Sequence, residues 1–390
     1  MRIPTTARGI GLIATSALLL AGCSTSDADG DEPIVIAHVG DFSGDWSYYD
    51  QPIRDGLRLA AEEINDDGGI LGQQVEILAI DTHGNQADAV RGVEEALDAD
   101  AVYIVGTTDS GGWQAQASVA CGEGVPISTG DGTSGTLVPS AGDCAHHVIM
   151  VNATQSAVAA EYALGEGYEN AYVLSSTDDA YLTELPDNFV DAFEHGGGTI
   201  VANEQFRYGA SDFNVQVTQI AGLSPQPDFI YTPMFSPDTP QFLRQLRAAG
   251  VDLPVISGDG SVDSSILVVG EPAEGLIATF HAWPSDDNDV QAFIENFEEG
   301  ADASTSPQHI VSGLGYDELY MIKQVIEEQD EASPEALMEG FTNLTYEGVT
   351  GSLTMDPDTR QAAKEVAILR VEDGKYVFID SFVPEYVPSL

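Results

Sequence analysis

Basic residues are scarce in this 390-residue chain. Lysine and arginine together number 13, against 64 aspartates and glutamates, so the formal net charge is −51 at pH 7. A surface with this excess of negative charge repels the phosphate backbone, so we exclude nucleic acid as a partner. The acids are scattered over predicted helix faces, for example at Glu62, Glu94 and Glu327. This scatter favours a protein from salty surroundings, where ions screen the repulsion, over one with a single acidic docking patch.

Cysteine is also rare, with 3 in the chain. If Cys23 is modified, as argued below, Cys121 and Cys144 remain as a pair, and an even pair in an exported chain favours a disulfide. A zinc site is the alternative, but His146 and His147 beside Cys144 lack a second spaced pair of ligands. We therefore expect a disulfide and no metal.

Familiar catalytic motifs are missing as well. The chain has no Gly-x-Ser-x-Gly elbow, no P-loop and no zinc motif. After the first predicted strand, residues 40–44 read Gly-Asp-Phe-Ser-Gly, which does not match the dinucleotide-binding Gly-x-Gly-x-x-Gly. We expect neither an enzyme nor a bound cofactor.

One apolar run, residues 9–20, follows Arg2 and Arg8 at the start of the chain. Its length is typical of a secretory signal and too short for a permanent membrane span. It ends in Leu-Ala-Gly-Cys, which resembles the lipobox of bacterial and some archaeal lipoproteins. The resemblance implies a signal peptide over 1–22 and a lipid on Cys23, with an ordinary secretory signal as the alternative. Residues 23–32 then form a flexible tether, because their composition cannot bury a core. We expect an anchored protein in the periplasm or on the outer face of the cell membrane.

Downstream, apolar runs of strand length alternate with segments of helical period, which predicts successive βαβ units and parallel sheets covered on both faces. The first set comprises strands near 34–39, 75–80, 101–105 and 126–128 with helices near 52–64, 87–97 and 113–120. The second comprises strands near 171–174, 199–202, 229–231, 255–256 and 276–279 with helices near 156–164, 185–193, 213–223 and 240–248. Helices near 289–299 and 308–328 follow, and then hairpin-like strands near 351–355, 366–371 and 376–379. Two doubly wound α/β lobes are the simplest fold.

Three segments together resemble the solute-binding proteins of branched-chain amino acid ABC transporters, the leucine/isoleucine/valine-binding type. Residues 38–44 read His-Val-Gly-Asp-Phe-Ser-Gly, 61–72 read Ala-Glu-Glu-Ile-Asn-Asp-Asp-Gly-Gly-Ile-Leu-Gly, and 125–128 read Val-Pro-Ile-Ser. The likeness in order and spacing runs from about Ile34 to the end of the chain. It implies two Rossmann-like lobes that close on a ligand held in the cleft between them.

The resemblance also implies where the lobes divide. Lobe one would hold 33–150 and 283–349, and lobe two would hold 151–282 and 350–390. Three crossings, near Val151, Ala282 and Thr350, would form the hinge. We expect a monomer that works with the permease and ATPase subunits of an importer.

For the ligand's carboxylate, the loop at 106–112 stands between a predicted strand and helix, where unpaired N–H groups attract anions. Ser110 aligns with the family's carboxylate-binding serine; a helix cap is the alternative, and one residue can fill both roles. In the loop after the next strand, Thr133 would contact the ammonium or the carboxylate. The alignment needs one extra residue there, so Asp131 or Thr129 could take that place, or the stretch could be a surface turn.

For the ligand's ammonium, Asp259 in Ser-Gly-Asp-Gly matches the family's acidic partner, since a buried cation needs a carboxylate. Gly-Asp-Gly is also a common turn, and the leucine-type proteins carry glutamate at this place. Asp109 and Asp131 depart from the family too, because two acids would repel a ligand carboxylate. Either they point outward, or the ligand is an amide, a urea-like compound or a basic amino acid.

Aromatic side chains would form the walls of the cleft. The resemblance places an aromatic residue after the first strand and a tyrosine in lobe two. At a third position, where the family has another tyrosine, this chain has a phenylalanine and so lacks the hydroxyl. The corresponding residues are Trp46, Tyr48 and Tyr49, then Tyr181, and then Phe235; Tyr316 and Trp283 are weaker candidates.

The sequence thus leads first to a lipid-anchored receptor that captures a small amine-bearing solute, such as a branched-chain or other amino acid, for an ABC importer. The alternative is a ligand-sensing module for amides, urea-like compounds or amino acids that feeds a signalling partner. The absence of any signalling domain in the sequence argues against a self-contained receptor.

Overall fold

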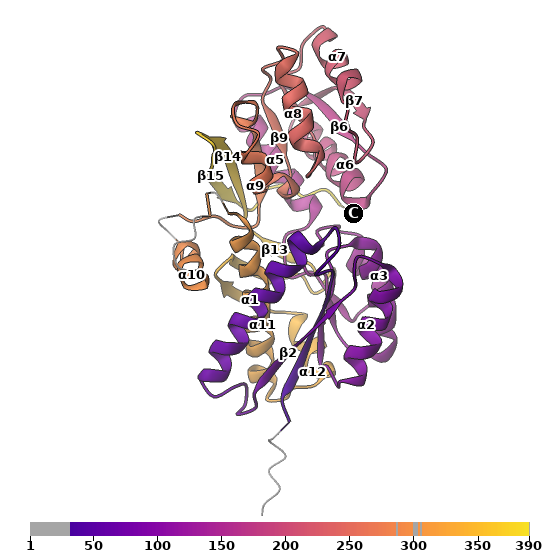
Figure 1. Ribbon diagram of the computed structural model, residues 1–390, viewed down its shortest axis with the longest axis vertical. Coiled ribbons are helices and arrows are strands. Elements are labelled where there is room, and N and C mark those ends of the chain that lie inside the picture. Colours follow the sequence, from indigo (N-terminus) through magenta and orange to yellow (C-terminus); the bar gives the residue numbers. More distant parts are fainter. Residues whose placement is uncertain (1–31, 286–287, 299–302, 305, 390) are drawn as a thin grey trace, which may run out of the picture.

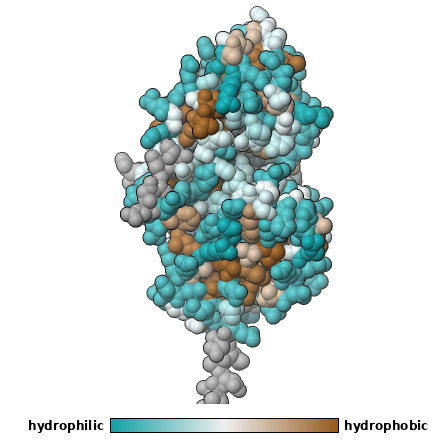
Figure 2. Space-filling model, in the orientation of Figure 1, coloured by the Kyte–Doolittle hydropathy of each residue, from teal (hydrophilic) through white to brown (hydrophobic). Residues whose placement is uncertain are grey.

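A computed structural model describes residues 32–285, 288–298, 303–304 and 306–389. The expected signal peptide, Cys23 and the tether up to residue 31 lie outside the described residues. Figure 1 shows two lobes stacked along the long axis, and hydrophilic side chains cover most of the face drawn in Figure 2. Within the described ranges, no helix is both long enough and apolar enough to span a bilayer.

The first lobe is built on a parallel sheet with strand order β2-β1-β3-β4-β5. In β1, Ile34 and Ile36 face one hydrophobic core while Ala37 and Val39 face another, because side chains alternate along a strand. Both faces of the sheet are therefore buried. The strands are β1 (Ile34–Gly40), β2 (Val75–Asp81), β3 (Tyr103–Val105), β4 (Ile127–Ser128) and β5 (Ala145–His146).

Helices cover both faces of this sheet. Helices α1 (Ser47–Asp66) and α11 (Gln308–Gln329) pack against each other on one face, although about 240 positions separate them in the chain (Figure 1). They approach closely at Gly56, where a Cβ atom would overlap the carbonyl oxygen of Ser312. The other face and the periphery carry α2 (Gln86–Asp98), α3 (Ser110–Glu123), α4 (Leu137–Ala141), α10 (Val290–Phe297) and α12 (Pro334–Phe341).

The predicted disulfide joins α3 to the start of β5. Cys121 and Cys144 are bonded, with their Cα atoms 5.5 Å apart. The bond closes a loop that contains β4 and the polar residues following it, and a loop of this length contributes about 3 kcal/mol in the chain-entropy model. The prediction of a disulfide is confirmed.

The second lobe contains a seven-stranded sheet in the order β15-β14-β10-β9-β8-β6-β7, in which β14 and β15 run antiparallel to their neighbours. Its strands are β6 (Asn170–Ser175), β7 (Thr199–Gln205), β8 (Phe229–Tyr231), β9 (Val255–Ser257), β10 (Ile277–Phe280), β14 (Val366–Glu372) and β15 (Lys375–Phe382). Its helices are α5 (Asn152–Gly165) and α6 (Ala180–His195) on one face, with α7 (Asn214–Gly222), α8 (Asp238–Ala248) and α9 (Ser264–Leu267) on the other. The two-lobed α/β fold predicted from the sequence is confirmed.

The third crossing comes later in the chain than predicted. Strands β11 (Thr345–Gly348), β12 (Gly351–Met355) and β13 (Ala362–Lys364) form a separate antiparallel sheet. His147 of the first lobe bonds with the backbone beside β13, donating to Arg360 and accepting from Ala362. The chain therefore enters the second lobe's sheet between Lys364 and Val366, not near Thr350, because the hairpin after Thr350 pairs back onto β11. The crossings expected near Val151 and Ala282 stay predictions.

Candidate ligand-binding cleft

A cavity opens between the lobes and receives side chains from both of them. It contains about 460 Å³ of space between its lining atoms, open solvent included, which is within the range of small-molecule sites, about 300–1,000 Å³. The first lobe contributes Trp46, Tyr49, Thr108, Ser110, Asp131, Gly132, Thr133 and Ser134, and the second contributes Asp179, Tyr181, Phe235, Asp259 and Gly260.

Nearly all of these residues follow the carboxyl ends of parallel strands. In the first lobe they lie beyond β1, β3 and β4, and in the second beyond β6, β8 and β9. Open α/β sheets bind ligands at this end. Glycine is needed at one point of closest packing, since a Cβ at Gly258 would collide with the Tyr181 hydroxyl and with Leu185.

Asp50 in α1 fixes the two loops that reach the cavity from the first lobe. Its fully buried carboxylate accepts hydrogen bonds from the Asp41 N–H at 2.6 Å and from the Thr107 hydroxyl at 2.7 Å. It also accepts from the Thr108 N–H at 3.0 Å and the Thr108 hydroxyl at 2.5 Å. Asp41 in turn accepts from the N–H of Trp46 at 3.0 Å. The carboxylate of Asp50 thus fixes the position of the Trp46 loop relative to the loop that carries Ser110.

Asp259 is held in place by neighbours within the second lobe. Its Oδ1 accepts hydrogen bonds from the Gln155 amide and from the Tyr181 hydroxyl, each at 2.8 Å. The amide of Gln155 is oriented by Thr279, whose hydroxyl donates to the Gln155 Oε1 at 2.8 Å. The Oδ2 of Asp259 is left directed toward His281.

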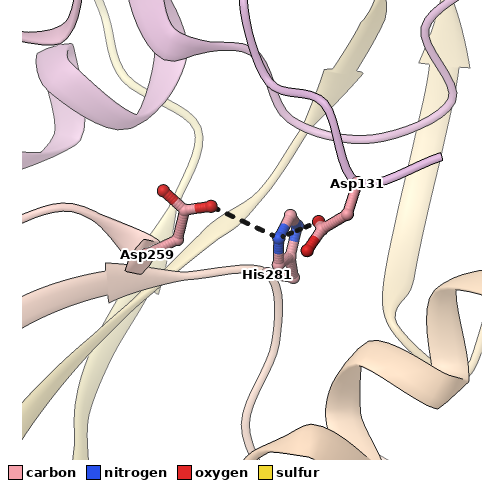
Figure 3. Close-up of side chains that lie close together, drawn as sticks. All are labelled: Asp131, Asp259 and His281. Carbon is pink, nitrogen blue, oxygen red and sulfur yellow. Dashed lines mark ion pairs between the residues drawn. The ribbon is translucent and has the colours of Figure 1, made fainter. Parts of the chain in front are cut away.

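His281, in the second crossing, lies between acids from the two lobes (Figure 3). Its Nε2 is 2.9 Å from the Oδ1 of Asp131 and 3.7 Å from the Oδ2 of Asp259, and its side chain is 1% exposed. The ligand atoms of these three residues lie within 4.8 Å of one another, close enough to surround a metal ion. Metal-bound imidazoles, however, usually donate their second N–H to a partner, and the Nδ1 of His281 has none among the described residues.

Burial and neighbouring charge raise the pKa of Asp259 and Asp179, which face the cavity. The pKa of Asp259 is raised chiefly by burial and further by Asp131, while His281 offsets part of the shift. The pKa of Asp179 is raised by burial, with a contribution from Asp109. Burial and the charge of Asp259 also raise the pKa of Tyr181 well above its usual value. Negative charge in this cavity is therefore poorly compensated by the protein.

Comparisons with known proteins agree with this two-lobed cleft. The family model described as periplasmic binding protein matches residues 33–375. The chain belongs to this family. The leucine-, isoleucine-, valine-, threonine- and alanine-binding protein of Pseudomonas aeruginosa is 25% identical over 343 residues, covering 87% of this chain and 90% of that protein.

Solved structures resemble this periplasmic binding protein in fold. A leucine-binding protein from Thermotoga maritima superposes with a TM-score of 0.79 at 25% identity, covering 90% of this chain and 99% of its own. A branched-chain amino acid transporter substrate-binding protein from Streptococcus pneumoniae, solved with isoleucine, gives a TM-score of 0.77 at 21% identity, covering 92% and 100%.

Most of the residues proposed from the sequence meet in the cleft of this periplasmic binding protein. Eight of them line the cavity, namely Ser110, Thr133, Asp259, Tyr181, Tyr49, Trp46, Phe235 and Asp131. Their individual roles toward a ligand stay predictions.

Asp109 and Tyr48 do not line the cavity, and neither do the weaker candidates Tyr316 and Trp283 or the alternative Thr129. Asp109 is the N-cap of α3, where its carboxylate accepts from the Gly112 N–H at 2.8 Å. Asp109, and not Ser110, therefore caps the helix. Tyr48 lies behind Tyr49, with their rings edge to face and 5.2 Å apart, because successive residues of a helix point in different directions.

Sequence reasoning missed several polar residues at the cleft. Thr108 and Ser134 line the cavity, and the others are His281, Asp179 and Glu184. His281 precedes Ala282, where a crossing between the lobes was predicted. This position could have marked it as a residue of the cleft. Asp179 lines the cavity from the N-cap of α6. Glu184, also in α6, accepts hydrogen bonds across the cleft from the hydroxyls of Ser134 at 2.6 Å and Thr136 at 2.8 Å; no sequence signal marked it.

Proposed function

We propose that this chain is the lipid-anchored, extracytoplasmic substrate-binding protein of an ABC importer, and that it captures a small amine-bearing solute by closure of its lobes. The observation that carries the proposal is that Ser110 and Asp259, from opposite lobes, line one cavity. The binding functions in the names of its relatives support it. The chain would deliver its ligand to permease and ATPase subunits without changing it chemically.

Asp259 is the proposed partner of the ligand's ammonium. A buried cation without a carboxylate is strongly destabilised, and Gln155 and Tyr181 already hold this carboxylate in position. Ser110 and Thr133 reach the polar end of the ligand from the first lobe. Only the closed form touches the ligand with both lobes, so binding shifts the population toward closure.

Isothermal titration against a panel of amino acids and their amides tests this proposal. We expect binding in the micromolar range, about −8 kcal/mol, and a loss of at least 100-fold in Asp259→Asn. Asp252→Asn is the matched control, because Asp252 is an exposed acid of the same lobe outside the cavity. The proposal is contradicted if the unmodified protein binds no compound of the panel, or if Asp259→Asn and Asp252→Asn bind with equal affinity.

A further inference from the structure

Carboxylates and aromatic rings dominate the lining of the cavity. Asp131, Asp179 and Asp259 all face it, and none of the lining residues that the structure describes is a lysine or an arginine. Among the residues that the structure describes, His281 is the one basic group that contacts these acids. Even a charged imidazole leaves an excess of two negative charges around the cavity. The net acidity of the chain does not explain this excess, because Asp131 is buried, Asp179 and Asp259 are partly buried, and all three are gathered at one place.

The helix N-terminus expected to receive a ligand carboxylate is already capped by a carboxylate of the protein, next to the cavity. The N-terminus of α3 offers N–H groups and the positive end of the helix dipole. Asp109 accepts the Gly112 N–H there at 2.8 Å, and the raised pKa of Asp179 includes a contribution from Asp109. A second anion beside Ser110 would therefore meet repulsion from Asp109 and Asp179.

The aromatic residues supply surfaces that attract cations. Phe235 lies 6.3 Å from Trp46 and 5.8 Å from Tyr181, measured between ring centroids, so rings from both lobes gather at one end of the cavity. Tyr49 completes this wall, and Asp131 and Asp259 raise its pKa further above the value set by burial. Ring faces carry partial negative charge and stabilise a desolvated cation.

We propose that the cavity selects an organic cation that lacks a free carboxylate, in preference to a zwitterionic amino acid. The cation would lie between the aromatic wall and the carboxylates of Asp131 and Asp259. This inference rests on the proposed function, since it takes the cavity as the ligand site, and it names the chemical class of ligand. A zwitterion brings one negative charge that Asp109 and Asp179 oppose, whereas an amine without a carboxylate brings none.

Matched pairs of ligands test the inference by titration calorimetry at fixed ionic strength and pH 7. The pairs are leucine with 3-methylbutylamine, phenylalanine with phenethylamine, and arginine with agmatine, which differ within each pair only in the carboxylate. We expect the amine to bind at least 10-fold more tightly than the amino acid in every pair that binds. Tighter binding of the amino acids overturns this inference and leaves the proposed function standing. If none of the six compounds binds, both this inference and the proposed function are contradicted.

Two variants connect the preference to its structural cause. Asp109→Asn keeps an N-capping side chain but removes the charge, and we expect it to lower the ratio of amine to amino acid affinity by about threefold to tenfold. Asp98→Asn, an exposed acid of the same lobe, should leave the ratio unchanged. An unchanged ratio in Asp109→Asn would show that this carboxylate does not select the ligand.

Discussion

Glu318 shows at the scale of one residue how the interior of the protein controls an acid. Its side chain lies in α11 inside the first lobe, with the residue 2% exposed. Burial raises its pKa to about 7, although the hydroxyls of Ser128 and Tyr103 oppose the shift. An unfolded chain returns this carboxyl to its ordinary value of 4.5. Between these two values the folded protein binds the proton more tightly than the unfolded chain, so the stabilisation present at low pH is lost as the pH rises through 7.

We predict that Glu318→Gln makes the free energy of unfolding less dependent on pH. Relative to the unmodified protein, the variant should gain about 3 kcal/mol between pH 4.5 and pH 8, because glutamine has no charge to bury. Denaturant unfolding at both pH values, at constant ionic strength, measures the difference. Glu328→Gln, at an exposed position of the same helix, is the control. Parallel pH curves for all three proteins would contradict the assignment.

Single residues could be predicted where a motif or an alignment marked their loop. Asp259 follows a strand within Ser-Gly-Asp-Gly, and it does line the cleft. The direction of a side chain within a loop could not be predicted, which is why Asp109 was left open between an outward position and a place beside the ligand, and only the structure shows that it caps α3. Glu184 carried no signal either, because it reaches the cleft from an ordinary helical position and its partners belong to the other lobe.

At the scale of elements, α1 connects the fold to the site. Most elements were predicted within a few residues, because buried strands and amphipathic helices leave strong periodic patterns. Helix α1 was predicted to begin near Pro52 and instead begins at Ser47. Proline is favoured in the first turn of a helix, and here it lies further inside. The longer helix brings Tyr49 to the cavity and Asp50 to the loops behind it.

We predict that Asp50→Asn weakens ligand binding although Asp50 does not touch the cavity. An amide cannot accept all four hydrogen bonds that the carboxylate accepts. The Trp46 and Ser110 loops should therefore no longer be held in a fixed position relative to each other. We expect a loss of about 10-fold in affinity, or 1.4 kcal/mol. Calorimetry measures it, and circular dichroism verifies that the variant is folded. Asp66→Asn, an exposed acid of the same helix, should bind normally; equal affinities would show that the loops hold their positions without Asp50.

At the scale of the whole molecule, the question is what keeps the lobes together. The two lobes could be predicted from the sequence, since they follow from the order of strands and helices. The sequence could not predict contacts across the cleft, which depend on how far the lobes close. Glu184 makes several such contacts: Ser134, Gly135 and Thr136 of the first lobe all donate to its carboxylate, as does Asn152 of its own lobe.

We predict that Glu184→Ala shifts the ligand-free protein toward an open form. Hydrogen bonds to a charged acceptor contribute about 1.5–3 kcal/mol each when they replace water, and opening the cleft breaks the three that cross it. If only the closed form retains ligand, the apparent affinity falls in proportion to the closed population, and we expect a decrease of about 10-fold. Small-angle X-ray scattering should show a larger radius of gyration without ligand and an unchanged one at saturation. Glu194→Ala, on the exposed side of the same helix, controls for helix stability. If Glu184→Ala scatters and binds like the unmodified protein, contacts with the ligand alone must hold the cleft closed.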